Sequence, residues 1–337
     1  MIAYCFGSEL RRKAQTPLQS KIANLKSQIA YIFPGQGSQH PGMGKDLVEK
    51  FPAARQVFEE ADDALGFALS NLCFNGPAEQ LQLTENTQPA ILAASIAALR
   101  AMQAENFPAP AFVAGHSLGE YSALVAANGL LLSDAIKTVR ARGRYMQEAV
   151  PVGSGAMAAI LGADMDVIAR ACEEAAQGQV CSAANINLPS QVVIAGDADA
   201  IDRAIVMLKE RGAKRAVKLN VSAPFHCALM QPAQNRLAAD LQNIAFSHLS
   251  VPLITNADAR PIEDGEAARQ SLIRQVSQTV RWLEAVEFLI NQGVQTFIEI
   301  GPGKVLSGLV RQIDRSVRCV NIEDEASLRF AREALAN

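Results

Sequence analysis

A serine between two glycines, Ser117 in the stretch GHSLG at residues 115–119, is the clearest candidate for chemistry in this chain. The stretch follows an apolar run and opens a segment with helical periodicity. In that context G-x-S-x-G is typical of a nucleophile at a sharp strand-to-helix turn. The start of a helix also supplies free N–H groups and a partial positive charge for a developing oxyanion. The alternative is an ordinary helix N-cap without chemical function, but the placement favours the nucleophile.

A serine needs a base to become a good nucleophile. The chain contains four histidines: His40, His116, His226 and His248. His116 directly precedes the serine, so its side chain should diverge from the hydroxyl at the turn. His248, in FSHLS, has no turn residues around it and is expected at the surface or in the core. His226, in VSAPFHCALM, lies where an inserted segment returns to the main domain, which makes it the candidate base, although a lone histidine is more often structural.

An arginine within residues 134–150 is a candidate for binding an anion. This segment is predicted to be a helix, and its apolar residues define one face: Ile136, Val139, Met146 and Val150. At about 100° per residue, Arg142 falls closest to that face, Arg140 a little farther and Arg144 farthest. Gly143 would let another backbone or a ligand approach. Arg142 could therefore bind a carboxylate through two hydrogen bonds; the alternative is a surface arginine with a buried stem.

The glycine-rich stretch PGQGSQHPGMG at residues 34–44 suggests a phosphate-binding loop, but its spacing does not fit one. The dinucleotide pattern beginning at Gly35 would need glycine at His40, and the P-loop pattern before Lys45 would need glycine at Gln39. A turn after a strand remains. Its N–H groups could face Ser117 and supply the second donor of an oxyanion hole.

Four short apolar runs, each followed by a turn containing glycine or asparagine, predict buried strands: 29–33, 111–114, 251–255 and 296–300. Helical patterns lie between them, and this alternation predicts a parallel sheet covered on both faces. Sites in such sheets form where the carboxyl ends of the strands meet loops. The turns around Ser117 and the glycine-rich stretch both lie at such ends.

A different pattern runs from residue 155 to residue 221, where the order strand, helix, strand, strand, helix, strand predicts a ferredoxin-like unit. We therefore expect an α/β fold in which this subdomain, at 153–221, is inserted into a larger α/β domain at 28–152 and 222–325. Residues 1–27 are expected to be a basic N-terminal extension on the surface. Residues 326–337 are expected to be a C-terminal tail.

Composition excludes several classes of protein. The 337 residues are 49% hydrophobic and 19% charged with a net charge of −3, which fits a globular protein and gives no basic footprint for nucleic acid. No apolar run approaches the ~20 residues that span a membrane. The six cysteines form no C-x-x-C pair or zinc-finger spacing, so we expect no metal site and a reducing, cytoplasmic location.

Taken together, these motifs resemble the malonyl-CoA:acyl carrier protein transacylases, including the stand-alone acyltransferases of polyketide synthesis. The stretches that carry the resemblance, in the family's order, are FPGQGSQ, GHSLGEYSALV, RGRYMQEAV, GSGAMAAILG, QVVIAG, HCALM and IGPGKVL. The resemblance covers about residues 28–325, and the pair GQGSQ and GHSLGE is highly specific. It implies an α/β-hydrolase-like domain with a ferredoxin-like insert, in agreement with the pattern of strands and helices.

The resemblance also implies roles for individual residues. Ser117 would be the acylated nucleophile and His226 its general base. Backbone N–H groups of Gln36 and Leu118 would form the oxyanion hole. Arg142 would hold the free carboxylate of the malonyl group. Malonyl-CoA would be a substrate, with no tightly bound cofactor, and the acceptor would be the phosphopantetheine thiol of an acyl carrier protein in a ping-pong reaction.

The remaining residues expected around the substrate are His116, Phe225, Asn256 and Gln275. Gln275 matches the position whose carbonyl orients the histidine, and Asn256 is a weaker candidate for lining the site. Phe225 should crowd a branched malonyl unit, which favours malonyl over methylmalonyl. A basic cluster in the insert could meet an acidic carrier protein or could be only a solvated surface: Lys214, Arg215 and Lys218. We expect a monomer.

Other functions stay open at this point. An acyl hydrolase of the same fold could clear carrier proteins, although a hydrolase of neutral acyl chains has little use for a buried Arg142. An ordinary esterase is disfavoured because no histidine follows His248. A silent docking subunit is disfavoured by the joint presence of Ser117, His226 and Arg142. A transacylase for another carboxyacyl unit is a further alternative.

Overall fold

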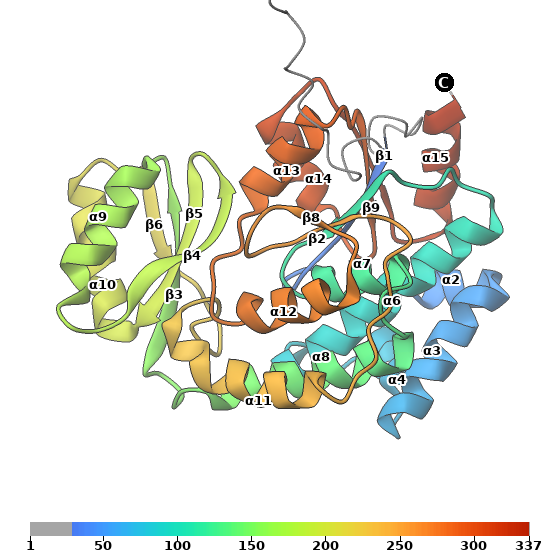
Figure 1. Cartoon of the computed structure of the whole chain (residues 1–337), viewed down its shortest axis with the longest axis horizontal. Helices are drawn as coiled ribbons and strands as arrows, with labels where there is room; N and C mark the ends of the chain where they lie inside the picture. Colours follow the sequence, from blue (N-terminus) through green and yellow to red (C-terminus); the bar gives the residue numbers. More distant parts are fainter. Residues whose placement is uncertain (1–28, 337) are drawn as a thin grey trace, which may run out of the picture.

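The computed structural model describes residues 29–336, and the predicted extension at 1–27 lies outside the described residues. Two sheets organise the fold (Figure 1). The larger has the strand order β10-β9-β1-β2-β7-β8, and the smaller has the order β4-β5-β3-β6. The strands of the larger sheet are β1 (Ile29–Phe33), β2 (Phe112–Gly115), β7 (Leu253–Ile254), β8 (Pro261–Ile262), β9 (Thr296–Ile300) and β10 (Arg318–Ile322). The fold is therefore the predicted α/β class with a largely parallel main sheet.

The strands expected from apolar runs are β1, β2, β7 and β9, which lie side by side at the centre of the main sheet. All their mutual pairings are parallel. Two edge strands carry no comparable apolar run. β10 pairs in parallel with β9 and contains Arg318 and Asn321, whereas β8 is two residues long and antiparallel to β7.

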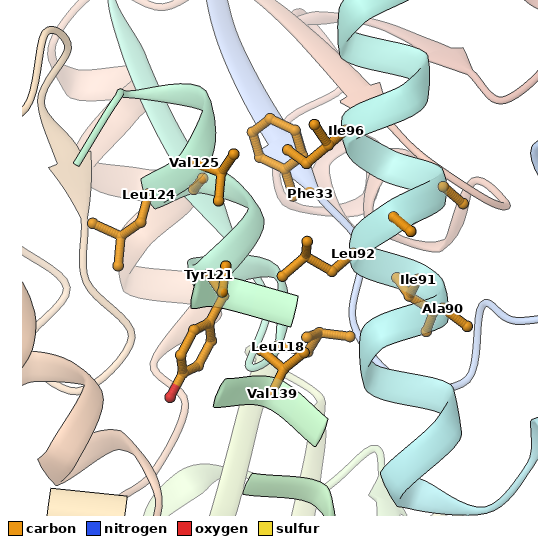
Figure 2. Packing of buried hydrophobic residues seen from close by; sticks show 14 of the residues in the cluster. Phe33, Ala90, Ile91, Leu92, Ile96, Leu118, Tyr121, Leu124, Val125 and Val139 are labelled. Carbon is orange, nitrogen blue, oxygen red and sulfur yellow. The ribbon is translucent and has the colours of Figure 1, made fainter. Parts of the chain in front are cut away.

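Alternate residues of β1 enter different cores. Ala30 and Ile32 face a core that includes Trp282, whereas Tyr31 and Phe33 face the other core. The helices on the two faces are α6 (Thr84–Ala104), α7 (Gly119–Ala126) and α8 (Leu132–Glu148) against α13 (Trp282–Asn291) and α14 (Val305–Ile313). Figure 2 shows Phe33 together with side chains of α6 and α7 in one apolar cluster. This packing fixes the start of α7, directly after the turn that holds the candidate nucleophile Ser117.

The smaller sheet has ferredoxin-like connectivity, in the order β3 (Gly155–Leu161), α9 (Met165–Ala176), β4 (Cys181–Leu188), β5 (Gln191–Asp197), α10 (Ala198–Glu210) and β6 (Arg215–Lys218). All its pairings are antiparallel, and α9 and α10 lie together on one side of it (Figure 1). The edge strand β4 is joined to the main domain. The Ile186 N–H donates to the Val280 carbonyl at 2.9 Å, and the Val280 N–H donates to the Ala184 carbonyl at 2.8 Å.

Most of the predicted C-terminal tail at 326–337 lies in helix α15 (Glu325–Ala336), which no sequence pattern had indicated. Leu328 and Ala331, three residues apart, are buried in the main core, and this amphipathic spacing holds the helix against the sheet. The other described helices are α2 (Lys45–Lys50), α3 (Pro52–Leu65), α4 (Leu69–Asn75), α5 (Ala78–Leu81), the 3-10 turn Ala228–Met230, α11 (Gln231–Leu241) and α12 (Gly265–Gln275).

Candidate active site

Ser117 occupies the turn between β2 and α7 with a left-handed backbone, φ 52°. The glycines on either side of it have no room for a side chain. A Cβ on Gly115 would lie 2.0 Å from the Gly119 carbonyl, and one on Gly119 would lie 2.1 Å from the Phe33 carbonyl oxygen. The small residues therefore let the chain reverse tightly against β1. This is the strand–turn–helix context that distinguishes a nucleophile elbow from an ordinary helix N-cap.

Asn256, which follows β7, holds this turn from the side of the neighbouring strand. Its Oδ1 accepts from the Ser117 N–H at 2.6 Å, and its Nδ2 donates to the Gly115 carbonyl at 2.7 Å. Both polar ends of the amide are thereby used on the backbone of the elbow. Asn256 is only 2% exposed, and its two hydrogen bonds stabilise the turn.

His226 contacts the serine directly, with its Nε2 2.7 Å from Ser117 Oγ. Its other ring nitrogen, Nδ1, lies 2.8 Å from the Gln275 carbonyl oxygen. A carbonyl can only accept, so Nδ1 carries the proton and Nε2 is left as the acceptor for the serine hydroxyl. Burial, followed by the positive charge of Arg142, lowers the pKa of His226 to about 3. The imidazole is therefore neutral near pH 7, as a general base must be.

Arg142 lies beside the same hydroxyl and is 2% exposed. Its Nη2 donates to Ser117 Oγ at 3.2 Å and to Gln275 Oε1 at 2.9 Å, and its Nη1 donates to Gln88 Oε1 at 2.7 Å. The guanidinium also lies 5.7 Å from the Tyr121 ring centroid. Its buried Nε has no partner among the described residues. The site thus holds a buried cation next to the Ser117 hydroxyl, with hydrogen-bonding capacity left for an anion.

The predicted order of the arginines on α8 is confirmed, because Arg142 is buried, Arg140 is half-buried and Arg144 is exposed. Gly143 serves the packing of two helices. A Cβ there would lie 2.6 Å from the Thr84 carbonyl oxygen at the start of α6. The close approach expected at this glycine is therefore made by another backbone.

Gln275 connects several of these groups. Besides its carbonyl contact to His226 and its side-chain contact to Arg142, its Nε2 donates to the Ser117 carbonyl and to Glu120 Oε2, each at 2.8 Å. Glu120 is fully buried, and burial raises the pKa of its carboxyl group, while its hydrogen bonds and Arg142 oppose that rise. A carboxylate therefore lies within the site, although it does not contact the histidine.

The other predicted residues lie around this centre. The side chain of His116 diverges from the hydroxyl, as expected, and its Nε2 contacts Asn187 Oδ1 on β4 at 2.9 Å. Phe225, next to His226, is 8% exposed in the main core. Gln36 follows β1, and a Cβ on the preceding Gly35 would lie 2.4 Å from the His116 carbonyl oxygen, so this loop crosses the elbow closely.

Sequence reasoning missed three polar residues of the site: Gln88, Glu120 and Asn187. Only Glu120 lies inside a motif that we singled out, three residues after the serine, and its neighbours on α7 are almost all buried. A charged residue in such a buried run is a usable signal, because carboxylates are rarely buried without partners. Gln88 and Asn187 carry no comparable signal.

Residues 29–336 contain no group of three or more His, Cys, Asp or Glu side chains that could hold a metal ion. Over the same range, none of the helices has the length and apolar character needed to cross a membrane.

The chain is similar in sequence to a known family of acyl transferases. Residues 30–330 match the family model described as an acyl transferase domain. The malonyl CoA-acyl carrier protein transacylase of Escherichia coli strain K12 is 48% identical over 307 residues, covering 91% of this chain and 99% of that protein. The corresponding protein of Bacillus subtilis strain 168 is 47% identical over 310 residues, covering 92% of this chain and 98% of that protein.

Solved structures give the same result. The acyl carrier protein S-malonyltransferase of Vibrio cholerae is 50% identical and superposes with a TM-score of 0.89, covering 90% of this chain and all of the other (100%). A malonyl-transacylase solved in complex with a type II polyketide synthase acyl-carrier protein is 49% identical with a TM-score of 0.89, covering 91% of this chain and 100% of that one.

Proposed function

The chain belongs to the acyl transferase family, among its malonyl-CoA:acyl carrier protein transacylases, and on that premise we propose that it moves a malonyl group from malonyl-CoA to the phosphopantetheine thiol of an acyl carrier protein. One observation carries the proposal. A neutral histidine and a buried arginine both contact Ser117 Oγ, at 2.7 and 3.2 Å. The first suits nucleophilic attack, and the second suits an acyl group that ends in a carboxylate.

In the first half-reaction, Ser117 Oγ forms a bond to the thioester carbon while its proton passes to His226 Nε2. The bond from carbon to sulfur then breaks, and the leaving sulfur takes that proton, so CoA departs as a thiol. A malonyl-serine ester remains, and His226 is neutral again. The Gln275 carbonyl keeps the ring in the tautomer that this transfer needs and stabilises the imidazolium that forms transiently.

In the second half-reaction the carrier thiol gives its proton to His226 Nε2 and attacks the ester carbon. Collapse of the intermediate breaks the bond to Oγ, which takes the proton back. In both half-reactions the backbone N–H groups of Gln36 and Leu118 receive the oxyanion. The close passage of the Gly35 loop over the elbow supports this assignment, since it brings the end of β1 to the start of α7. Loss of one such donor typically lowers the rate by about 10²–10³.

Arg142 selects the acyl unit. The carboxylate of a malonyl group lies two carbons from its acyl carbon, so once that acyl carbon reaches Ser117 Oγ the carboxylate arrives near a guanidinium only 3.2 Å from the same oxygen. The unpartnered Nε–H of Arg142 offers a hydrogen bond that no described residue uses. Charge-assisted hydrogen bonds of this kind are among the strong ones in proteins. A neutral acyl group would leave the arginine without an anion.

We also propose a monomer in the cytoplasm, with a large domain at 28–152 and 222–325 and an inserted domain at 153–221. The two separate sheets support this division. The acyl carrier protein is the expected macromolecular partner. The exposed basic residues on and before β6 are a candidate surface for it, although Lys218 already pairs with Asp202 at 2.9 Å.

The test is the intact mass of the protein after brief incubation with malonyl-CoA, acetyl-CoA or methylmalonyl-CoA, with Ser117→Ala as the control. A malonyl adduct on the wild type alone, which passes to added holo carrier protein, supports the transacylase. An adduct that is lost to water without acceptor favours the acyl hydrolase. The absence of any adduct favours a silent docking subunit, and preferential loading from methylmalonyl-CoA favours another carboxyacyl unit.

A further inference from the structure

Glu120 is a carboxylate buried behind the nucleophile, and the mechanism above gives it no role. It is 0% exposed, yet both of its oxygens have donors. Oε1 accepts from Ser271 Oγ at 2.9 Å, and Oε2 accepts from the Asn256 N–H at 3.0 Å and from Gln275 Nε2 at 2.8 Å. A buried charge held by this many donors is costly to keep without a purpose.

The contact to Gln275 decides which way that side-chain amide points. An amide has one donor end and one acceptor end of similar shape, and its environment fixes the choice. Here Nε2 faces two groups that can only accept, the Glu120 carboxylate and the Ser117 carbonyl. Oε1 is therefore left to accept from Arg142 at 2.9 Å. A neutral side chain at position 120 that can donate as well as accept, such as glutamine, would weaken the preference of the Gln275 amide for this orientation.

Glu120 is also a negative charge facing Arg142 across the amide. The two side chains attract each other electrostatically, while burial acts against the charged form of both. The hydrogen-bond acceptors around the guanidinium, Gln88, Gln275 and Ser117, are all neutral. Gln275 therefore lies between the Glu120 carboxylate and the Arg142 guanidinium. The position beside the guanidinium that an acyl carboxylate needs is not taken by Glu120.

We propose that Glu120 is a positioning residue for acyl-group selection, which acts through the Gln275 amide to keep Arg142 aimed at the nucleophile. This inference rests on the proposed function, since it concerns how the same site discriminates between acyl units. Gln275 then has two tasks. Its main-chain carbonyl orients His226, and its side-chain amide, oriented by Glu120, presents its oxygen to Arg142.

The experiment compares initial rates of Ser117 acylation from malonyl-CoA and from acetyl-CoA in wild type and Glu120→Gln. We expect the ratio of malonyl to acetyl loading to fall at least about tenfold, through a higher KM for malonyl-CoA, while acetyl loading persists. A purely structural role would lower both rates together. A folded Glu120→Gln protein with the wild-type ratio overturns the proposal.

Ser271→Ala is the matched control, because it removes one hydrogen bond from the same carboxylate without touching Gln275 or Arg142. We expect it to keep the wild-type ratio, and a tenfold fall there overturns the proposal as well. If Glu120→Gln does not fold by circular dichroism, Glu120→Asp replaces it. Asp keeps the charge but withdraws it by one methylene from Gln275 Nε2, so the ratio should again fall. Malonyl loading of wild type is measured alongside, and its absence would count against the proposed function and not against Glu120 alone.

Discussion

Replacement of Arg142 by alanine should exchange the acyl preference of this enzyme. The guanidinium is 2% exposed and contacts Ser117, Gln275 and Gln88. In Arg142→Ala, a malonyl group would bring its carboxylate into a buried site that no longer holds a cation. An acetyl group has no carboxylate and would meet only neutral surroundings. Malonyl loading should therefore fall while acetyl loading is retained or rises.

The size of the change follows from the cost of an unpaired buried charge. Removing one partner of a buried ion pair typically costs about 3–5 kcal/mol. At about 1.4 kcal/mol for each factor of ten, this corresponds to a change of about two to four orders of magnitude in the ratio of malonyl to acetyl loading. The alanine also leaves a cavity and frees the amides of Gln88 and Gln275. Those defects slow both donors alike, so they cancel in the ratio.

The assay measures initial rates of acyl-enzyme formation with each donor by intact mass. Arg144→Ala is the matched control, since it makes the same change two residues along the same helix at an exposed position. We expect the control to keep the wild-type preference. A wild-type ratio in folded Arg142→Ala would refute the assignment of this residue to the malonyl carboxylate.

Two further predictions concern the base and its neighbour. His226 acts only while neutral and its pKa is lowered to about 3, so acylation from acetyl-CoA, which does not depend on the charge of Glu120, should stay flat as the pH falls from 7 to about 4.5. Loss of the positive charge in Arg142→Ala should raise the pKa of His226, so the rate should begin to fall at a higher pH than in wild type. A wild-type rate that halves near pH 6.5 would contradict the geometry. Phe225→Ala should increase methylmalonyl loading relative to malonyl, measured by competition between the two donors, and an unchanged ratio would remove Phe225 from side-chain selection.

The elbow could be predicted from sequence because its requirements are local. A tight turn between strand and helix needs small residues on both sides of the nucleophile, and the structure shows backbone within 2.0–2.1 Å of where each Cβ would lie. Arg142 could be predicted because helical periodicity alone ranks the arginines of α8 by burial. The ferredoxin-like insert could be predicted because each of its elements has a clear apolar pattern over its own length.

Contacts between distant polar side chains could not be predicted in this way. Gln88 meets Arg142 across 54 residues, and His116 meets Asn187 across 71. Neither glutamine nor asparagine reveals its partner through spacing, since both donate and accept. The strand β10 and helix α15 were missed for a related reason. They pack against a sheet that forms from distant segments, and polar residues interrupt the apolar ones in both: Asn321 in β10, and Arg329 and Arg332 in α15.

The location of the Glu120 carboxylate fits the charge of the proposed acyl group. Serine hydrolases commonly place an acid behind the histidine, where it stabilises the imidazolium. Here a neutral carbonyl of Gln275 takes that position, and Glu120 lies behind Arg142 instead. An acid at the histidine would compete with the acyl carboxylate for the nearby guanidinium. With a carbonyl in its place, His226 stays neutral and Arg142 keeps an unused Nε–H, which is the arrangement that the proposed reaction needs to hold an anionic acyl group and still deprotonate the serine.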